Sequence, residues 1–183
     1  ARGYVASGRD AFLCLNPDLV LAPTALGELC QRLSHYPEAM IACPKLLRAD
    51  EDLAPLSPAV IDAAGMYFTS ALRHLDRGSG EPDRAQYDSE RFVAGGSGAC
   101  LLFKREAVEA LEVSGLEYES DSDVVYPQLA KDRSKRRLIF DEGFFAYRED
   151  AELALRCALL GWRCVYAPSA VGYHRRVVLP ERR

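Results

Sequence analysis

Short apolar runs alternate along this chain with helix-like stretches, and this alternation narrows the choice of fold more than any other pattern. Ala11 to Leu15 is continuously apolar and stops at Asn16-Pro17-Asp18, which is typical of a strand buried on both faces of a sheet. From Pro23 to Tyr36 the apolar residues recur at helical spacing, and Ala39 to Cys43 predicts the next strand. The two patterns together predict an α/β domain.

The second half of the chain continues the alternation. Phe92 to Phe103 has sheet character, interrupted by glycines, and a short helix is expected over 105–111. A longer helix is expected over 149–160, because acidic residues open it and a glycine follows it. Residues 163–167 and 170–173 predict two closing strands.

Two segments have no clear period. Residues 48–90 are rich in Asp, Pro, Ser and Gly, which predicts loops and short strands. Residues 117–137 are strongly charged and predict a surface insertion. No internal repeat or linker divides the chain, so residues 1–183 are expected to form a single domain.

Composition restricts the kinds of partner. The net charge of −4 gives no electrostatic reason to expect nucleic acid, and no apolar run approaches the ~20 residues of a membrane-spanning helix. Arg175, Arg176, Arg182 and Arg183 predict local surface charge near the end of the chain. The six cysteines are scattered without a CxxC pair, which predicts reduced core thiols and a cytoplasmic protein.

Two groups of acidic residues are candidates for chemistry. Asn16-Pro17-Asp18 follows a strand, and open α/β sheets bind ligands outside the carboxyl ends of their strands. A carboxylate there could hold a divalent cation, although Asp18 could equally cap the following turn. The pair Glu149-Asp150 could supply a general base, but helix capping is the simpler interpretation from the local sequence alone.

Other candidates are weaker. Gly95-Gly96-Ser97-Gly98-Ala99 would let backbone approach a ligand, or would merely form a turn. His174 could complete a metal site, although a single histidine is more often a packing residue. Asp121-Ser122-Asp123 has no apolar strand before it, and Cys100 has no histidine partner nearby, so neither is expected to be functional.

These motifs form an ordered series along the chain: Asn16-Pro17-Asp18, Asp62-Ala63-Ala64-Gly65, Gly78-Ser79-Gly80-Glu81, Gly95-Gly96-Ser97-Gly98-Ala99, Phe140 to Asp150, Gly161-Trp162 and Tyr173-His174. The series resembles the bacterial family 2 glycosyltransferases with the GT-A fold, especially rhamnosyltransferase-like members. The resemblance covers nearly the whole chain, and residues 144–153 are its most specific stretch.

The resemblance implies a role for each candidate. Asp18 matches the last acid of the metal-binding DxD motif, for Mg²⁺ or Mn²⁺, and Asn16 departs from a strict DxD. His174 matches a position that contacts the metal or the diphosphate. Donor and acceptor contacts are implied for Asn16, Gly96, Ser97 and Gly98. Asp150 matches the general base of the inverting enzymes, with Glu149 beside it.

The implied reaction transfers a sugar, with rhamnose as the best guess, from a nucleoside-diphosphate donor to a saccharide or lipid-linked acceptor in cell-surface polysaccharide synthesis. Such an acceptor would place the enzyme in the cytoplasm, at the inner face of the membrane. The resemblance implies a mixed GT-A sheet flanked by helices, and the family's nucleotide-binding strands would precede Ala1, so the expected sheet is N-terminally incomplete. Its exposed edge would favour homo-oligomers. Without the nucleotide-binding strands, weak or no donor binding is expected. The alternative is a non-catalytic sugar-nucleotide-binding or interaction module of the same fold.

Overall fold

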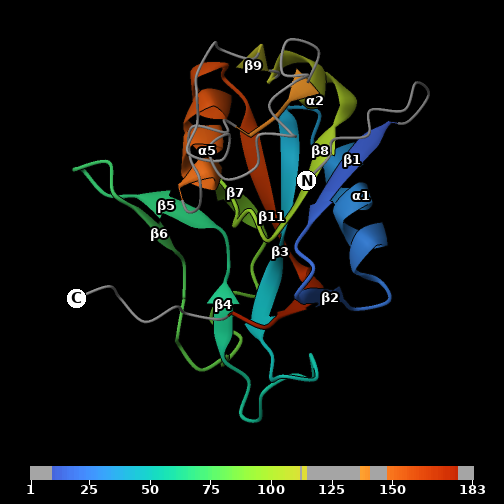
Figure 1. Cartoon of the computed structure of the whole chain (residues 1–183), viewed down its shortest axis with the longest axis vertical. Helices are drawn as coiled ribbons and strands as arrows, with labels where there is room; N and C mark the ends of the chain where they lie inside the picture. Colours follow the sequence, from blue (N-terminus) through green and yellow to red (C-terminus); the bar gives the residue numbers. More distant parts are fainter. Residues whose placement is uncertain (1–9, 112, 115–136, 141–147, 177–183) are drawn as a thin grey trace, which may run out of the picture.

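The computed structural model describes residues 10–111, 113–114, 137–140 and 148–176. A seven-stranded sheet runs through these residues in the order β1-β8-β3-β11-β2, with β4 beside β3 and β7 beside β11 (Figure 1). Its strands are β1 (Ala11–Leu15), β2 (Leu19–Leu21), β3 (Ala39–Arg48), β4 (Ile61–Ala63), β7 (Arg91–Val93), β8 (Cys100–Lys104) and β11 (Arg163–His174).

The remaining elements are smaller or cover the sheet. Two short antiparallel pairs are β5 (Met66–Phe68) with β6 (His74–Asp76), and β9 (Val113–Ser114) with β10 (Arg137–Leu138). The helices are α1 (Ala25–His35), α2 (Arg105–Ala110) and α5 (Glu149–Leu159). The sheet is mixed, because β3 and β11 are parallel while β1, β2, β4, β7 and β8 pair antiparallel with their neighbours. The predicted α/β architecture with a mixed sheet is confirmed.

Successive side chains of the central strands point to opposite faces of the sheet, and helices cover each face, so both faces are buried. One face carries Ile41, Phe103 and Tyr166, and the helical residues packed with them are Ala107, Val108, Leu153 and Cys157 of α2 and α5. The other face carries Ala42, Leu102 and Val165, which pack against Leu29 and Leu33 of α1. Figure 1 shows α1 and α5 on opposite sides of the central strands.

The side chain of Arg156 links helix α5 to two neighbouring segments. The guanidinium of Arg156 donates to the carbonyl oxygens of Leu111 at 2.7 Å and Ile139 at 2.6 Å, and it pairs with Glu152 one turn earlier. Gly161 ends the helix with φ of +76°, a conformation that favours glycine, as the sequence predicts. The position of α5 therefore depends on polar contacts as well as on apolar packing.

Several expectations about single elements need correction. The apolar run of β1 predicts burial on both faces, yet only Cys14 is buried in it and Leu15 is exposed, because β1 ends the described sheet path. The two closing strands are one strand, β11, with a register irregularity between Ala167 and Val171. Within α1, Leu26 and Cys30 are exposed, while Ala25, Leu29 and Leu33 face the core.

Other expectations are confirmed or lie outside the described residues. The loop-rich middle contains β4, β5 and β6 as short strands, and α2 follows β8 where a short helix is expected. The charged segment 117–137, with Asp121-Ser122-Asp123, lies almost wholly outside the described residues. In the described part of the chain, no helix is both long and apolar enough to cross a membrane.

Candidate active site

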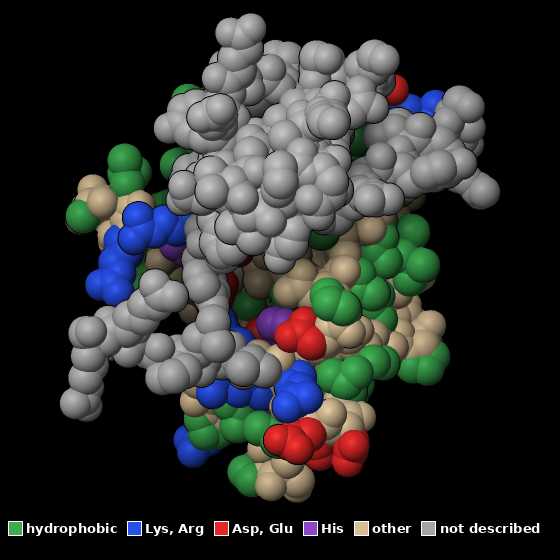
Figure 2. All heavy atoms as spheres, viewed as in Figure 1, with side chains coloured by type: hydrophobic (Ala, Val, Ile, Leu, Met, Phe, Trp, Pro, Cys, Tyr) green, Lys and Arg blue, Asp and Glu red, His purple; other side chains and the backbone are tan. Residues whose placement is uncertain are grey.

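The last described strand brings His174 next to Asp18. Because β11 lies between β3 and β2, His174 pairs with Leu19, and the N–H of Arg175 donates to the carbonyl oxygen of Asp18 at 2.9 Å. This pairing places Nε2 of His174 3.5 Å from Oδ1 of Asp18. His174 is buried, whereas the side chain of Asp18 is 40% exposed. On the face drawn in Figure 2, histidine and acidic side chains lie together near the centre.

The other ring nitrogen of His174 contacts Asp62, which belongs to the motif series but was assigned no role from the sequence. Oδ2 of Asp62 in β4 lies 2.7 Å from Nδ1 of His174, and Asp62 is 1% exposed. Arg176 donates to Oδ1 of Asp62 at 3.3 Å and to Asp76 at 3.0 Å. The available signal was an acid inside the apolar stretch Ile61 to Ala64, since such an acid needs a buried partner.

This network sets the charge of His174. Burial works to lower the pKa of His174, but the hydrogen bond to Asp62 and the charges of Asp62 and Asp18 outweigh it, so its pKa is raised. Burial is also the main cause of the raised pKa of Asp76, which Arg176 partly offsets. The histidine is held from one side and presents its second nitrogen to Asp18.

The pair Asp18 and His174 fits a divalent cation. Metal-binding histidines commonly give their second ring nitrogen to a carboxylate, as His174 does with Asp62. Ligand atoms about 2.1 Å from one ion lie at most about 4.2 Å apart, so the 3.5 Å between Nε2 and Oδ1 is compatible with a shared ion. The described residues hold no cluster of three or more His, Cys, Asp or Glu arranged for a metal, so the remaining ligands would come from substrate and water.

Asp150 lies at the start of α5 and faces the glycine-rich loop between β7 and β8. Its Oδ2 accepts a hydrogen bond from the N–H of Gly98 at 3.1 Å, and its Oδ1 accepts from the N–H of Ala151 at 2.8 Å. These two contacts fix the plane of the carboxylate. The N-cap of α5 is Arg148, so the candidate base is not the cap; it accepts from one N–H in the first turn of the helix.

The same loop reaches the strand that carries Asn16. The N–H of Asn16 donates to the carbonyl oxygen of Ala99 at 2.9 Å, and the thiol of Cys14 lies 3.7 Å from the carbonyl oxygen of Gly98. The Ser97 hydroxyl accepts from the N–H of Ala99 at 3.3 Å and so shapes the loop itself. These contacts bring Asn16, Ser97, Gly98 and Asp150 together around one loop, and their use as a common site stays a prediction.

Two glycines let this loop lie close to its neighbours. A Cβ on Gly96 would lie 2.3 Å from Cβ of Cys43, and one on Gly95 would lie 2.6 Å from Cβ of Ala154 in α5. Gly96 thus packs against β3 and does not face the open site. Cys100, which follows the loop, is buried, and burial raises the pKa of its thiol to about 12, so it is an inert core residue as expected.

Glu149 lies beside Asp150, and its carboxylate is poorly supplied with hydrogen bonds from the described residues. Its Oε2 is buried without a hydrogen-bond partner in the described part of the chain, and Oε1 lies 3.7 Å from the Cβ that a side chain at Gly98 would have. Burial is the main cause that raises the pKa of Glu149, with a smaller contribution from the charge of Asp150. A carboxylate kept in such surroundings is typical of a functional site.

We expect Glu149→Gln to raise the melting temperature near neutral pH. The folded chain holds this proton more tightly than the unfolded chain, so ionisation destabilises the fold as pH rises from the ordinary value of 4.5 through the raised pKa. Glutamine does not ionise, and its advantage should disappear at pH values below 4.5. Thermal denaturation across this pH range measures the difference in melting temperature, with Glu106→Gln at an exposed position of α2 as the control. Equal pH profiles for Glu149→Gln and the unmutated chain would contradict the prediction.

Comparison with known proteins decides the family. The model of the family described as "Glycosyltransferase like family 2" matches residues 5–179. The chain belongs to this family. The mixed α/β sheet flanked by helices is the GT-A arrangement that the family resemblance implies.

The other comparisons are more distant. Among curated proteins, none matches this chain. A crystal structure of GalNAc-T7 with UDP, GalNAc and Mn²⁺ aligns with a TM-score of 0.49 and 12% identity over 92% of this chain. The chain spans 28% of the length of that protein.

Proposed function

We propose that this family 2 domain catalyses transfer of a sugar from a nucleoside-diphosphate donor to a hydroxyl group of a saccharide or lipid-linked acceptor. The reaction inverts the anomeric centre, and residues 1–183 act as the acceptor-side, catalytic part of one domain. The family match over residues 5–179 supports sugar transfer in general.

One observation carries the proposal: a single loop joins the candidate base to the candidate donor site. Gly98 donates to Asp150, and the neighbouring Ala99 accepts from Asn16. Two residues beyond Asn16, Asp18 faces His174. A sugar held near Asn16 and Asp18 would therefore lie beside a carboxylate that is already oriented by two backbone N–H groups.

The proposed step is one in-line displacement. The acceptor oxygen bonds to the anomeric carbon as the bond from that carbon to the diphosphate oxygen breaks, and the acceptor's proton passes to the carboxylate of Asp150. Glu149 would assist in positioning the acceptor. Ser97 and Gly98 would bound the space beside the donor sugar, whereas Gly96 lets the loop pack against β3. General-base assistance of this kind is worth typically about 10²–10⁴-fold in rate.

Asp18 and His174 would hold Mg²⁺ or Mn²⁺ together with the diphosphate. When bound, such a cation stabilises the negative charge that develops on the leaving group. Asp62 would keep His174 in the orientation that presents Nε2 to the metal. Arg176, which contacts Asp62, adds positive charge beside this position.

The finer identity of the substrates follows from the family resemblance. We propose rhamnose, carried on dTDP, as the donor sugar, and an acceptor in cell-surface polysaccharide synthesis. The enzyme would then act in the cytoplasm at the inner face of the membrane. Self-association along the exposed strand β1 would give a homo-oligomer.

The experiment incubates the chain with a panel of nucleotide sugars and Mn²⁺ or Mg²⁺ and measures released nucleoside diphosphate. We expect release from one donor, loss of release with a chelator, and a large loss in Asp18→Ala. Because Asp18 is partly exposed, its removal should leave the melting temperature unchanged. Metal-independent release would refute the cation site, and no release from any donor would favour a non-catalytic binding module.

A further inference from the structure

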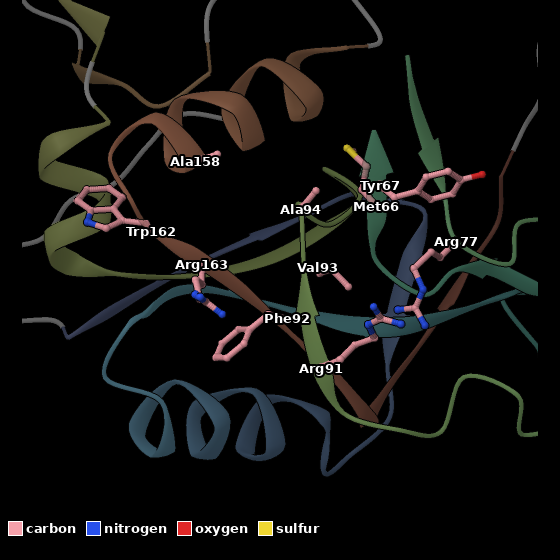
Figure 3. Close-up of a pocket in the computed structure, with 10 residues that line it drawn as sticks. All are labelled: Met66, Tyr67, Arg77, Arg91, Phe92, Val93, Ala94, Ala158, Trp162 and Arg163. Atoms are coloured by element: carbon pink, nitrogen blue, oxygen red, sulfur yellow. The ribbon is translucent and has the colours of Figure 1, made fainter. Parts of the chain in front are cut away.

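A cavity lies at the edge of the sheet, between β7, the β5–β6 pair and the C-terminal end of α5. It has a volume of about 340 Å³ and opens to solvent. Figure 3 shows Arg77 and Arg91 close together at one side of it, and Arg163 with Trp162 at the other. None of the residues assigned above to donor, acceptor or metal binding lines this cavity.

The charged side chains described in the cavity lining are all positive. Three arginines line it, whereas none of its described lining residues is acidic, although the whole chain has a net charge of −4. The nearest acids along the chain are engaged elsewhere: Asp76, directly before Arg77, pairs with Arg176 at 3.0 Å. Glu90 pairs with Arg32 and accepts from the hydroxyl of Tyr36, and Asp88 pairs with Lys45. In the described part of the chain, no carboxylate forms an ion pair with the arginines of the cavity.

One of the three guanidinium groups is held in place. Arg77 donates to the carbonyl oxygen of Ala64 at 2.7 Å, and its guanidinium lies 4.8 Å from the ring centre of Tyr87 and 5.3 Å from that of Tyr166. Burial lowers the pKa of Arg77, and the charge of Arg91 lowers it further. Two like charges thus lie side by side, with most of their N–H donors not used by the described protein.

Aromatic side chains line the cavity on both sides: Phe92 and Trp162 lie toward Arg163, and Tyr67 lies beside Arg77 (Figure 3). The guanidinium of Arg163 lies 4.8 Å from the ring centre of Phe92, and Trp162 and Tyr67 also line the cavity. Flat aromatic surfaces beside a few fixed polar groups are typical of small-ligand sites. Their faces suit the apolar faces of sugar rings, and arginine binds carboxylate and phosphate groups in a bidentate manner.

The cavity is also joined to the proposed active site. Met66 lines it, donates its N–H to the carbonyl oxygen of Gly95 at 2.8 Å and packs with Ala151 and Ala154 of α5. Ala94 lines the cavity one residue before the glycine-rich loop. Ala158, at the far end of α5, lies about 12 Å along the helix from Asp150. An extended ligand could therefore contact both regions.

We propose that this cavity binds an anionic group, a carboxylate or a phosphate, on the saccharide acceptor. The identification of the ligand as the acceptor rests on the proposed function, whereas the anion site itself does not. The acceptor would then be an acidic or phosphorylated saccharide chain. Residues close to its reacting end would lie by Asp150, and a charged residue further along would lie among Arg77, Arg91 and Arg163.

The test measures binding directly, without turnover. Trp162 is the single tryptophan of the chain, so its fluorescence reports on the cavity, and calorimetric titration gives a second readout. The probes are an oligogalacturonate, a neutral malto-oligosaccharide of equal length and inorganic phosphate. The variants Arg91→Gln and Arg163→Gln each remove one cavity charge, and the exposed Arg84→Gln is the matched control outside it.

We expect an anionic probe to bind more tightly than the neutral one, and each cavity variant to weaken it by about 10-fold. Arg84→Gln should leave the affinity unchanged. Preference for the oligogalacturonate over phosphate would indicate a carboxylate on the acceptor, and the reverse preference a phosphate. Affinity for the unmutated chain should fall as salt is added, which tests the site without any variant.

Two results would overturn the proposal: no binding of either anionic probe, or equal affinity in both cavity variants and the unmutated chain. A transferase active on neutral acceptors, combined with either result, would remove the cavity proposal and leave the proposed reaction standing. Anion binding in the cavity of a chain that releases no nucleoside diphosphate would support the anion site and count against the proposed reaction.

Discussion

Asp150→Asn is expected to lower the rate of sugar transfer by about 10²–10⁴-fold while leaving donor affinity nearly unchanged. The asparagine side chain is isosteric but cannot take the proton of the acceptor hydroxyl. It can still accept one of the two backbone hydrogen bonds, from Gly98 or from Ala151, so the loop should keep its shape. Steady-state kinetics with the active donor, and donor titration without acceptor, separate the two effects.

The loss of a first-turn carboxylate also weakens the helix, and a control must account for that. The contribution of such a charge is about 0.3–1 kcal/mol, which shifts the melting temperature but does not remove activity from a folded chain. Asp52→Asn, in an exposed turn, makes the same chemical change away from the site. If Asp150→Asn kept more than a tenth of the unmutated turnover, Asp150 would not be the base.

The second large effect is on stability: Asp62→Ala should lower the free energy of unfolding by about 3–5 kcal/mol. Asp62 is 1% exposed and contacts the buried ring of His174, so its removal leaves a polar, partly charged group without its partner. The same change frees His174 to rotate and should weaken Mn²⁺ binding. Urea denaturation gives the first quantity, and calorimetric titration with Mn²⁺ gives the second.

Asp76→Ala is the matched control for Asp62→Ala. Asp76 shares the contact with Arg176, but it does not touch His174 and its raised pKa means that burial disfavours its ionised form. Its removal should change stability by no more than about 1 kcal/mol. Equal losses of unfolding free energy in the two variants would mean that Asp62 stabilises the fold through its contact with Arg176 and not through its contact with His174.

Sequence patterns predicted local structure better than they predicted which elements meet. The apolar period predicted α1 to within two residues, and the acidic start and following glycine predicted α5 to within one, because these signals depend on neighbours along the chain. The short helix expected over 105–111 is α2. The burial of β1 was predicted wrongly, since a strand's exposure depends on what pairs with it. The same non-local pairing places His174 beside Asp18, and the sequence suggested it only through resemblance to a family.

The role of Asp62 illustrates the limit for the site. Nothing near it in the sequence is basic, and its partner His174 is far along the chain. An acid between apolar residues indicates that a buried partner exists, but it does not say which. The cavity arginines were missed for a similar reason: Arg77, Arg91 and Arg163 come from separate elements that meet only in the folded sheet.

The glycine-rich loop has a consequence for how this enzyme could change. Asn16 donates to the carbonyl oxygen of Ala99, and the neighbouring residue Gly98 donates to Asp150. A shift at the end of β1 would therefore reach the carboxylate through two hydrogen bonds and one short stretch of loop. In the proposed mechanism, donor choice at Asn16 and proton removal by Asp150 are therefore coupled. A substitution near Asn16 that admits a different sugar would also change the orientation of the Asp150 carboxylate. A change of donor specificity would then need compensating substitutions in α5.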